Sequence, residues 1–132
     1  LSFADEYENI SDYIALQTKH YLRILDKGCP VGEKEYENIY KLNGRIREYF
    51  IFINEVYKSK KVEENLVKAT EMRAQIATTY KKIRDNYMDR FREVNYSVDF
   101  VTAYMDILNT YRRMNNHIFH VSEILMYDKI ED

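Results

Sequence analysis

The sequence has little of what interrupts a helix or cross-links a chain. It has one cysteine, Cys29, so neither an intramolecular disulfide nor a cysteine zinc cluster can form within it. Three glycines and one proline leave room for only a few turns. No apolar run approaches the roughly 20 residues that a membrane-spanning helix needs, and the most apolar stretch, residues 49–53, is flanked by charges.

The sequence also lacks a large excess of either positive or negative residues. The 20 basic residues nearly balance the 22 acidic ones, giving a net charge of -2. Nucleic-acid-binding proteins usually carry a basic surface, so we expect no nucleic-acid partner. A composition of 45% hydrophobic and 32% charged residues is typical of a soluble globular domain. Because the chain begins with Leu1 and has no signal-peptide pattern, we expect one domain, residues 1–132, excised from a larger membrane transporter.

Apolar residues recur at spacings of three and four, whereas the alternation typical of strands is not found. The pattern predicts four helices, at about residues 3–27, 33–58, 63–93 and 98–127, with residues 128–132 as a frayed tail. Residues 28–32, which include Cys29, end the first helix, and Ser97 is a candidate N-cap for the fourth. Short connections make successive helices antiparallel, so we predict an all-α, up-down bundle with a core rich in its 13 tyrosines.

The predicted apolar stripes contain no acidic residue. They include Ile14 in the first helix, Tyr36 in the second and Phe91 in the third. Gly44 lies inside the second helix, where glycine costs about 1 kcal/mol relative to alanine, so we expect close packing or a kink there.

The last helix carries a dense polar strip opposite its apolar face, made of Arg112, Arg113, Asn116, His117 and His120. His117 and His120 are three residues apart, with Glu123 three further on, a spacing that could hold a transition metal. Because both histidines lie off the apolar stripe beside two arginines, solvated histidines are the favoured interpretation.

Glu8 and Asp12 are four residues apart and face one side of the first helix. They could hold a hard cation with several waters, or simply form a solvated acidic turn that complements the helix dipole. A di-iron centre in a helical bundle needs the motif Glu-x-x-His. The residues three before the histidines are Gln17, Met114 and His117, none of them a glutamate, so we expect no di-iron centre. No nucleophile, base and oxyanion donor converge, so we expect no enzyme activity.

Two segments resemble a known family. Residues 8–12 read ENISD, and residues 106–117 read DILNTYRRMNNH. Together they resemble the PhoU-like family, and more narrowly the cytoplasmic C-terminal domain of bacterial sodium-dependent phosphate cotransporters. Acidic pairs in that family hold metal clusters, which implies a divalent or iron ion at Glu8 and Asp12. The corresponding positions of the last helix are Arg112 and Asn116, so the resemblance equally implies an Arg112–acid pairing between helices.

The resemblance implies a non-catalytic PhoU-like regulatory bundle on the cytoplasmic side of the cell membrane, involved in phosphate transport or phosphate homeostasis. Its expected partner is the transmembrane part of its own transporter chain or a signalling protein. The alternatives are a metal-binding module at Glu8 and Asp12, and a generic helical interaction or homodimerisation domain. We expect the polar strip to pair with the first helix or to dock a partner.

Overall fold

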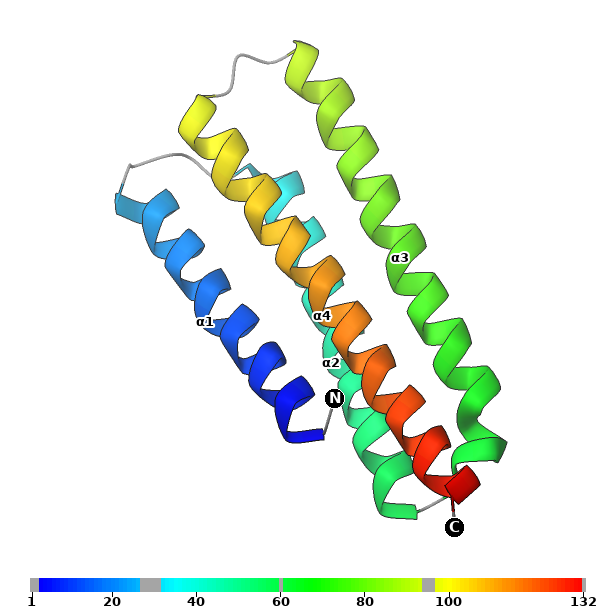
Figure 1. The fold of residues 1–132 in the computed structure, drawn as a ribbon. Coiled ribbons are helices and arrows are strands. Elements are labelled where there is room, and N and C mark those ends of the chain that lie inside the picture. The colour runs from blue at the N-terminus through cyan, green and yellow to red at the C-terminus, as the bar shows by residue number, and fades with distance from the viewer. Residues whose placement is uncertain (1–2, 27–31, 60, 94–96, 132) are drawn as a thin grey trace.

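The computed structural model describes residues 3–26, 32–59, 61–93 and 97–131. They form four helices, α1 (Phe3–Asp26), α2 (Glu33–Ser59), α3 (Val62–Glu93) and α4 (Val98–Glu131). Successive helices run in opposite directions (Figure 1), which confirms the predicted all-α four-helix bundle. None of the described helices is both long enough and apolar enough to cross a membrane.

The first hydrogen bonds of α4 and α2 show how these two helices begin. The Ser97 hydroxyl accepts a hydrogen bond from the Phe100 backbone N–H at 3.2 Å, so the predicted N-cap of α4 is confirmed. The Gly32 carbonyl accepts the Tyr36 N–H at 3.0 Å where α2 begins. The prediction of a frayed tail after Tyr127 was wrong for residues 128–131. They continue α4, because no glycine or proline there ends the helix. Residues 27–31, with Cys29, and residues 94–96 lie outside the described part.

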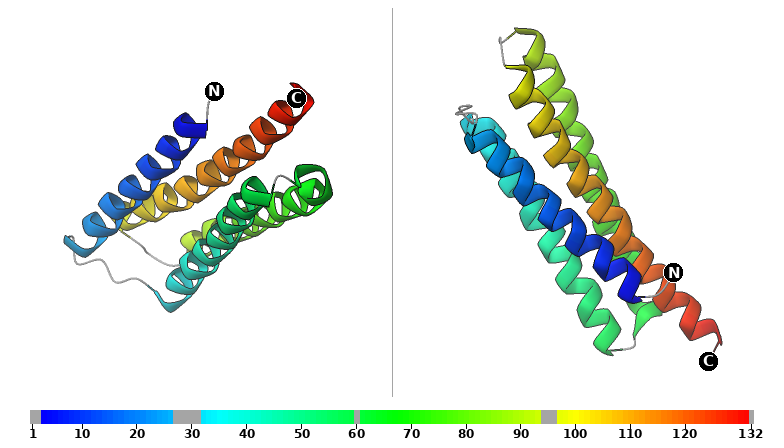
Figure 2. Two further views of the ribbon diagram at one scale, coloured as in Figure 1. Left: turned by 90° about the horizontal axis from the view of Figure 1, so that it is seen from below. Right: turned by 60° about the vertical axis from the view of Figure 1, so that its left-hand side comes forward.

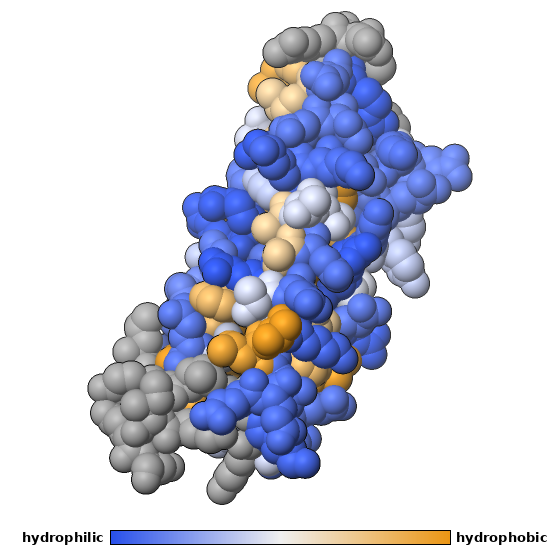
Figure 3. All heavy atoms as spheres, turned by 90° about the vertical axis from the view of Figure 1, so that its right-hand side faces the viewer, coloured by the Kyte–Doolittle hydropathy of each residue, from blue (hydrophilic) through white to orange (hydrophobic). Residues whose placement is uncertain are grey.

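α4 is the central helix of the bundle. It packs against each of the other three, most extensively against α1. Within the described ranges, α4 is the only helix with Cα atoms within 8 Å of those of α1 (Figure 2). Its fully buried side chains form the middle of the core: Tyr104, Ile107, Leu108, Tyr111 and Ile118. The outer face on the α3 side is mostly hydrophilic, with small apolar patches (Figure 3).

Some predicted core positions were wrong. Ile14, Tyr36 and Phe91 are 50%, 66% and 38% exposed, because the helices on which they lie turn other faces to the core. Gly44 is not a site of close packing, since a Cβ added there would meet nothing within 4 Å, and α2 continues through it.

The expectation that the core lacks acidic residues was also wrong. Glu6 is 0% exposed and Glu35 is 1% exposed. Each has a basic partner from another helix, His117 for Glu6 and Arg90 for Glu35. These partners offset the cost of burying a carboxylate, which is why a polar residue can occupy a core position.

Candidate metal centre between α1 and α4

Polar side chains connect α1 to α4 along the whole length of α1. The bonded atoms are 2.6 to 3.6 Å apart. The contacts are Glu6–His117, Gln17–Met114, Tyr21–Tyr111 and Arg23–Asp106. Because the two helices are antiparallel, the first turns of α1 lie beside the C-terminal half of α4. This arrangement brings an acidic N-terminal segment next to the two histidines.

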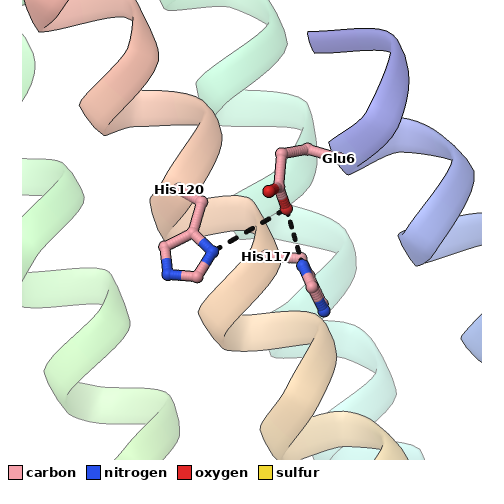
Figure 4. A group of neighbouring side chains, drawn as sticks. All are labelled: Glu6, His117 and His120. Carbon is pink, nitrogen blue, oxygen red and sulfur yellow. Dashed lines mark hydrogen bonds and ion pairs between the residues drawn. The ribbon is translucent and has the colours of Figure 1, made fainter. Parts of the chain in front are cut away.

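The densest group of ionisable side chains on this interface is Glu6 with His117 and His120. Nδ1 of His117 is 2.6 Å from Oε2 of Glu6, and Nδ1 of His120 is 3.8 Å from the same oxygen. The potential ligand atoms all lie within 4.8 Å of one another. Figure 4 shows the carboxylate reaching from α1 between the two imidazoles of α4. A spacing of three residues puts both rings on one face of the helix, one turn apart.

The group lies at the edge of the core and is partly open to solvent. The Glu6 side chain is fully buried, whereas the His117 and His120 side chains are 19% and 42% exposed. Oε1 of Glu6 and Nδ1 of His120 are buried atoms with no hydrogen-bond partner among the described residues. The Glu6 carboxylate is therefore only half satisfied, through its bond to His117.

The interpretation of two solvated histidines was wrong for His117, which bonds a buried carboxylate. The spacing of His117 and His120 indicated the right pair, but Glu6 completes the group instead of the exposed Glu123. The sequence held a partial signal for Glu6, its position on the face of α1 that includes Ile10, but not its partner. Glu6 stands four residues before Ile10 and so begins the face that continues to the buried Gln17.

The acidic pair Glu8 and Asp12 is exposed on α1. The three-residue group of potential ligands found in the described part of the chain includes neither of them. Metal binding at Glu8 and Asp12 therefore stays a prediction. It receives no geometric support here, and an exposed acidic turn is common without an ion.

The rest of the polar strip is distributed between two neighbours. The exposed Arg113 places its guanidinium 5.8 Å from the ring centre of Tyr13, on α1. Arg112 and Asn116 line a surface hollow of about 350 Å³ on the α3 side. The resemblance implied a pair between Arg112 and an acid of another helix, and this stays a prediction. The arginine–acid pairs between helices that the structure shows in the described residues are Arg23–Asp106 and Arg90–Glu35.

A second concavity, of about 420 Å³, lies between α1, α2 and α4. Half of its lining residues are tyrosines, and none of the lining residues is charged. Burial raises the pKa of Tyr104 to about 12 and also raises the pKa of Tyr111, so both hydroxyls are neutral at ordinary pH. This pocket offers aromatic rings and neutral hydroxyls, but no group suited to acid–base chemistry.

Comparison of the chain with protein-family models, with curated proteins and with solved structures finds no match. The PhoU-like resemblance therefore stays a prediction that rests on residues 8–12 and 106–117.

Proposed function

We propose that the chain is a non-catalytic regulatory bundle of a sodium-dependent phosphate transporter, acting on the cytoplasmic side of the cell membrane. The observation that carries this proposal is the position of the segment that resembles the cotransporters. Asp106, which begins the segment, and His117, which ends it, both contact α1. The resemblance thus falls on the residues that attach one helix to the centre of the bundle.

In this proposal α1 is the helix through which regulation acts. Its buried apolar residues among those described are Ile10 and Ile24, and polar pairs join it to α4 near both of its ends. The Arg23–Asp106 pair is 38% and 40% exposed, and such pairs contribute about 0–1 kcal/mol. A transporter segment or signalling protein that offers His117 and Asp106 partners of its own would compete with α1 for this face of α4.

The test is sodium-dependent uptake of labelled phosphate by cells that carry the full-length protein, at high and at low phosphate supply. Asp106→Arg repels Arg23 and is expected to weaken the response of uptake to supply. Asp85→Arg is the matched control, because Asp85 pairs with its neighbour Arg84 on the exposed face of α3. Unchanged uptake and an unchanged response after deletion of residues 1–132 would reject the proposal.

A metal-binding module is the second candidate function. Glu6, His117 and His120 favour it, and they are not the residues that the sequence resemblance implied.

A further inference from the structure

The donor atoms of Glu6, His117 and His120 are those preferred by a particular class of ion. Two imidazole nitrogens and one carboxylate oxygen suit Zn²⁺ and neighbouring divalent transition metals. Mg²⁺ and Ca²⁺ prefer shells made of oxygen ligands. The donor set therefore selects a borderline metal over the hard cations considered for Glu8 and Asp12.

The distances are close to those of a coordinated ion. Tetrahedral bonds of about 2.0–2.2 Å place ligand atoms about 3.3 Å apart. The two Nδ1 atoms lie 2.6 and 3.8 Å from Oε2 of Glu6, on either side of that value. The three ligand atoms all lie within 4.8 Å of one another, so side-chain movements of about 1 Å would bring them into a coordination shell.

The second oxygen of Glu6 gives an independent reason for a ligand. Glu6 is 0% exposed, yet its Oε1 has no hydrogen-bond partner among the described residues, and neither does the buried Nδ1 of His120. Leaving a buried polar group unpaired is costly, and a cation held by both carboxylate oxygens of Glu6 and by Nδ1 of His120 removes that cost. We infer that Glu6, His117 and His120 bind one divalent transition-metal ion of the Zn²⁺ class, which joins α1 to α4.

The coordination shell has a position for solvent. Three protein ligands leave the fourth position of a tetrahedron for a water molecule, as in open zinc sites. The ion also has a mechanical consequence. Tyr7 already contacts Asn54 and Phe50 of α2, and a metal bond from Glu6 would add an attachment of the same turns of α1 to α4.

The test is titration of metal-free protein with Zn²⁺ by calorimetry, and with Co²⁺ by visible absorption, which reports tetrahedral coordination. The wild type is expected to bind a single ion of each. Mutating a residue that only hydrogen-bonds to a metal ligand typically weakens metal binding about 10–100-fold. Glu6 and His120 are the proposed ligands themselves, so Glu6→Gln and His120→Ala are each expected to weaken binding at least about 100-fold. Glutamine at position 6 keeps a carbonyl that accepts the His117 hydrogen bond, and circular dichroism checks that each variant is folded.

Two variants are matched controls. Glu8→Gln makes the same change at an exposed position of the same helix, and Glu123→Gln removes the acid one turn beyond His120. Both are expected to bind like the wild type. The half-exposed His120 can be truncated without opening the core, so His120→Ala decides the matter if Glu6→Gln fails to fold.

Two results would overturn the inference. One is a wild type that binds Zn²⁺ no more tightly than the Glu6→Gln/His120→Ala double variant. The other is a loss in Glu8→Gln or Glu123→Gln as large as that in Glu6→Gln, because that would show general attraction to an acidic surface. Neither result bears on the uptake assay with Asp106→Arg, so the metal site and the proposed regulatory function fail separately.

Discussion

Two buried glutamates connect helices that are distant in the sequence. Glu6 joins α1 to α4 through His117, and Glu35 joins α2 to α3 through Arg90. In each pair the acid is fully buried and its partner is partly exposed. A buried carboxylate that loses its partner is strongly destabilising, so each pair favours the one helix register in which the partners meet.

Removing Arg90 is expected to destabilise the bundle. Its Nη2 is 2.6 Å from Oε1 of Glu35, so Arg90→Met removes a charge-assisted hydrogen bond to a buried carboxylate and lowers the free energy of unfolding by about 1.5–3 kcal/mol. Urea unfolding followed by circular dichroism measures the loss.

The matched control for Arg90 is Arg84→Met, which breaks the exposed pair with Asp85 and is expected to cost less than about 1 kcal/mol. Adding Glu35→Gln to Arg90→Met should recover most of the stability, since no buried charge remains. Equal small losses for Arg90→Met and Arg84→Met would contradict a stabilising role for the buried pair.

The candidate site was only half predictable from the sequence. The pair of His117 and His120 follows from helical spacing, which is local. Glu6 stands among Asp5 and Glu8, and its burial depends on which face α1 turns to α4. The register between two helices separated by more than 100 residues, shown by the contact of Glu6 with His117, is a tertiary property that no local pattern contains.

At the scale of the helices, glycine has opposite effects at the two positions in and before α2. A Cβ at Gly44 meets nothing within 4 Å, so Gly44→Ala is expected to raise the free energy of unfolding by about 1 kcal/mol. A Cβ at Gly32 would meet the carboxylate end of Glu35, which must shift beside its partner Arg90, and alanine is a poorer N-cap than glycine, so Gly32→Ala is expected to lower the stability slightly. Urea unfolding of both variants tests the contrast, and a loss of stability in Gly44→Ala would contradict it.

Helix positions were predictable because their signals are local. Ser97 marks the start of α4, residues 28–32 mark the end of α1, and the apolar spacing identifies four long helices. The central position of α4 was not predictable. All four helices are amphipathic, and only tertiary packing shows that α4 contacts the other three, whereas α1 lies on one side of it.

At the scale of the whole molecule, buried tyrosines should make the fold sensitive to high pH. Burial raises the pKa of Tyr104 from 10.0 to about 12, and burial also raises the pKa of Tyr49 and Tyr111. Between pH 10 and pH 12 the unfolded chain loses the proton of the Tyr104 hydroxyl, whereas the folded chain keeps it. The stability contributed by Tyr104 is therefore complete below about pH 10 and falls by about 1.4 kcal/mol per pH unit towards pH 12.

Urea unfolding at increasing pH, together with the ultraviolet absorbance of tyrosinate, measures this effect. Tyr104→Phe is expected to flatten the loss of stability, and Tyr40→Phe, at a position 74% exposed, is expected to leave it unchanged. Ionisation of all tyrosines at their ordinary pKa in a still-folded protein would contradict the burial of these hydroxyls.

The attachment of α1 to the polar face of α4 is tested most directly by hydrogen exchange of backbone amides, measured with and without Zn²⁺. Without metal, the amides of α1 should exchange faster than those in the middle of α2, α3 and α4, because α1 contributes only Ile10 and Ile24 to the buried apolar side chains of the described residues. Zn²⁺ should slow exchange in α1 and around His117, leave the middle of α3 unchanged, and have no effect in Glu6→Gln. Equal protection of all four helices without metal, and no response of α1 to Zn²⁺, would contradict this arrangement.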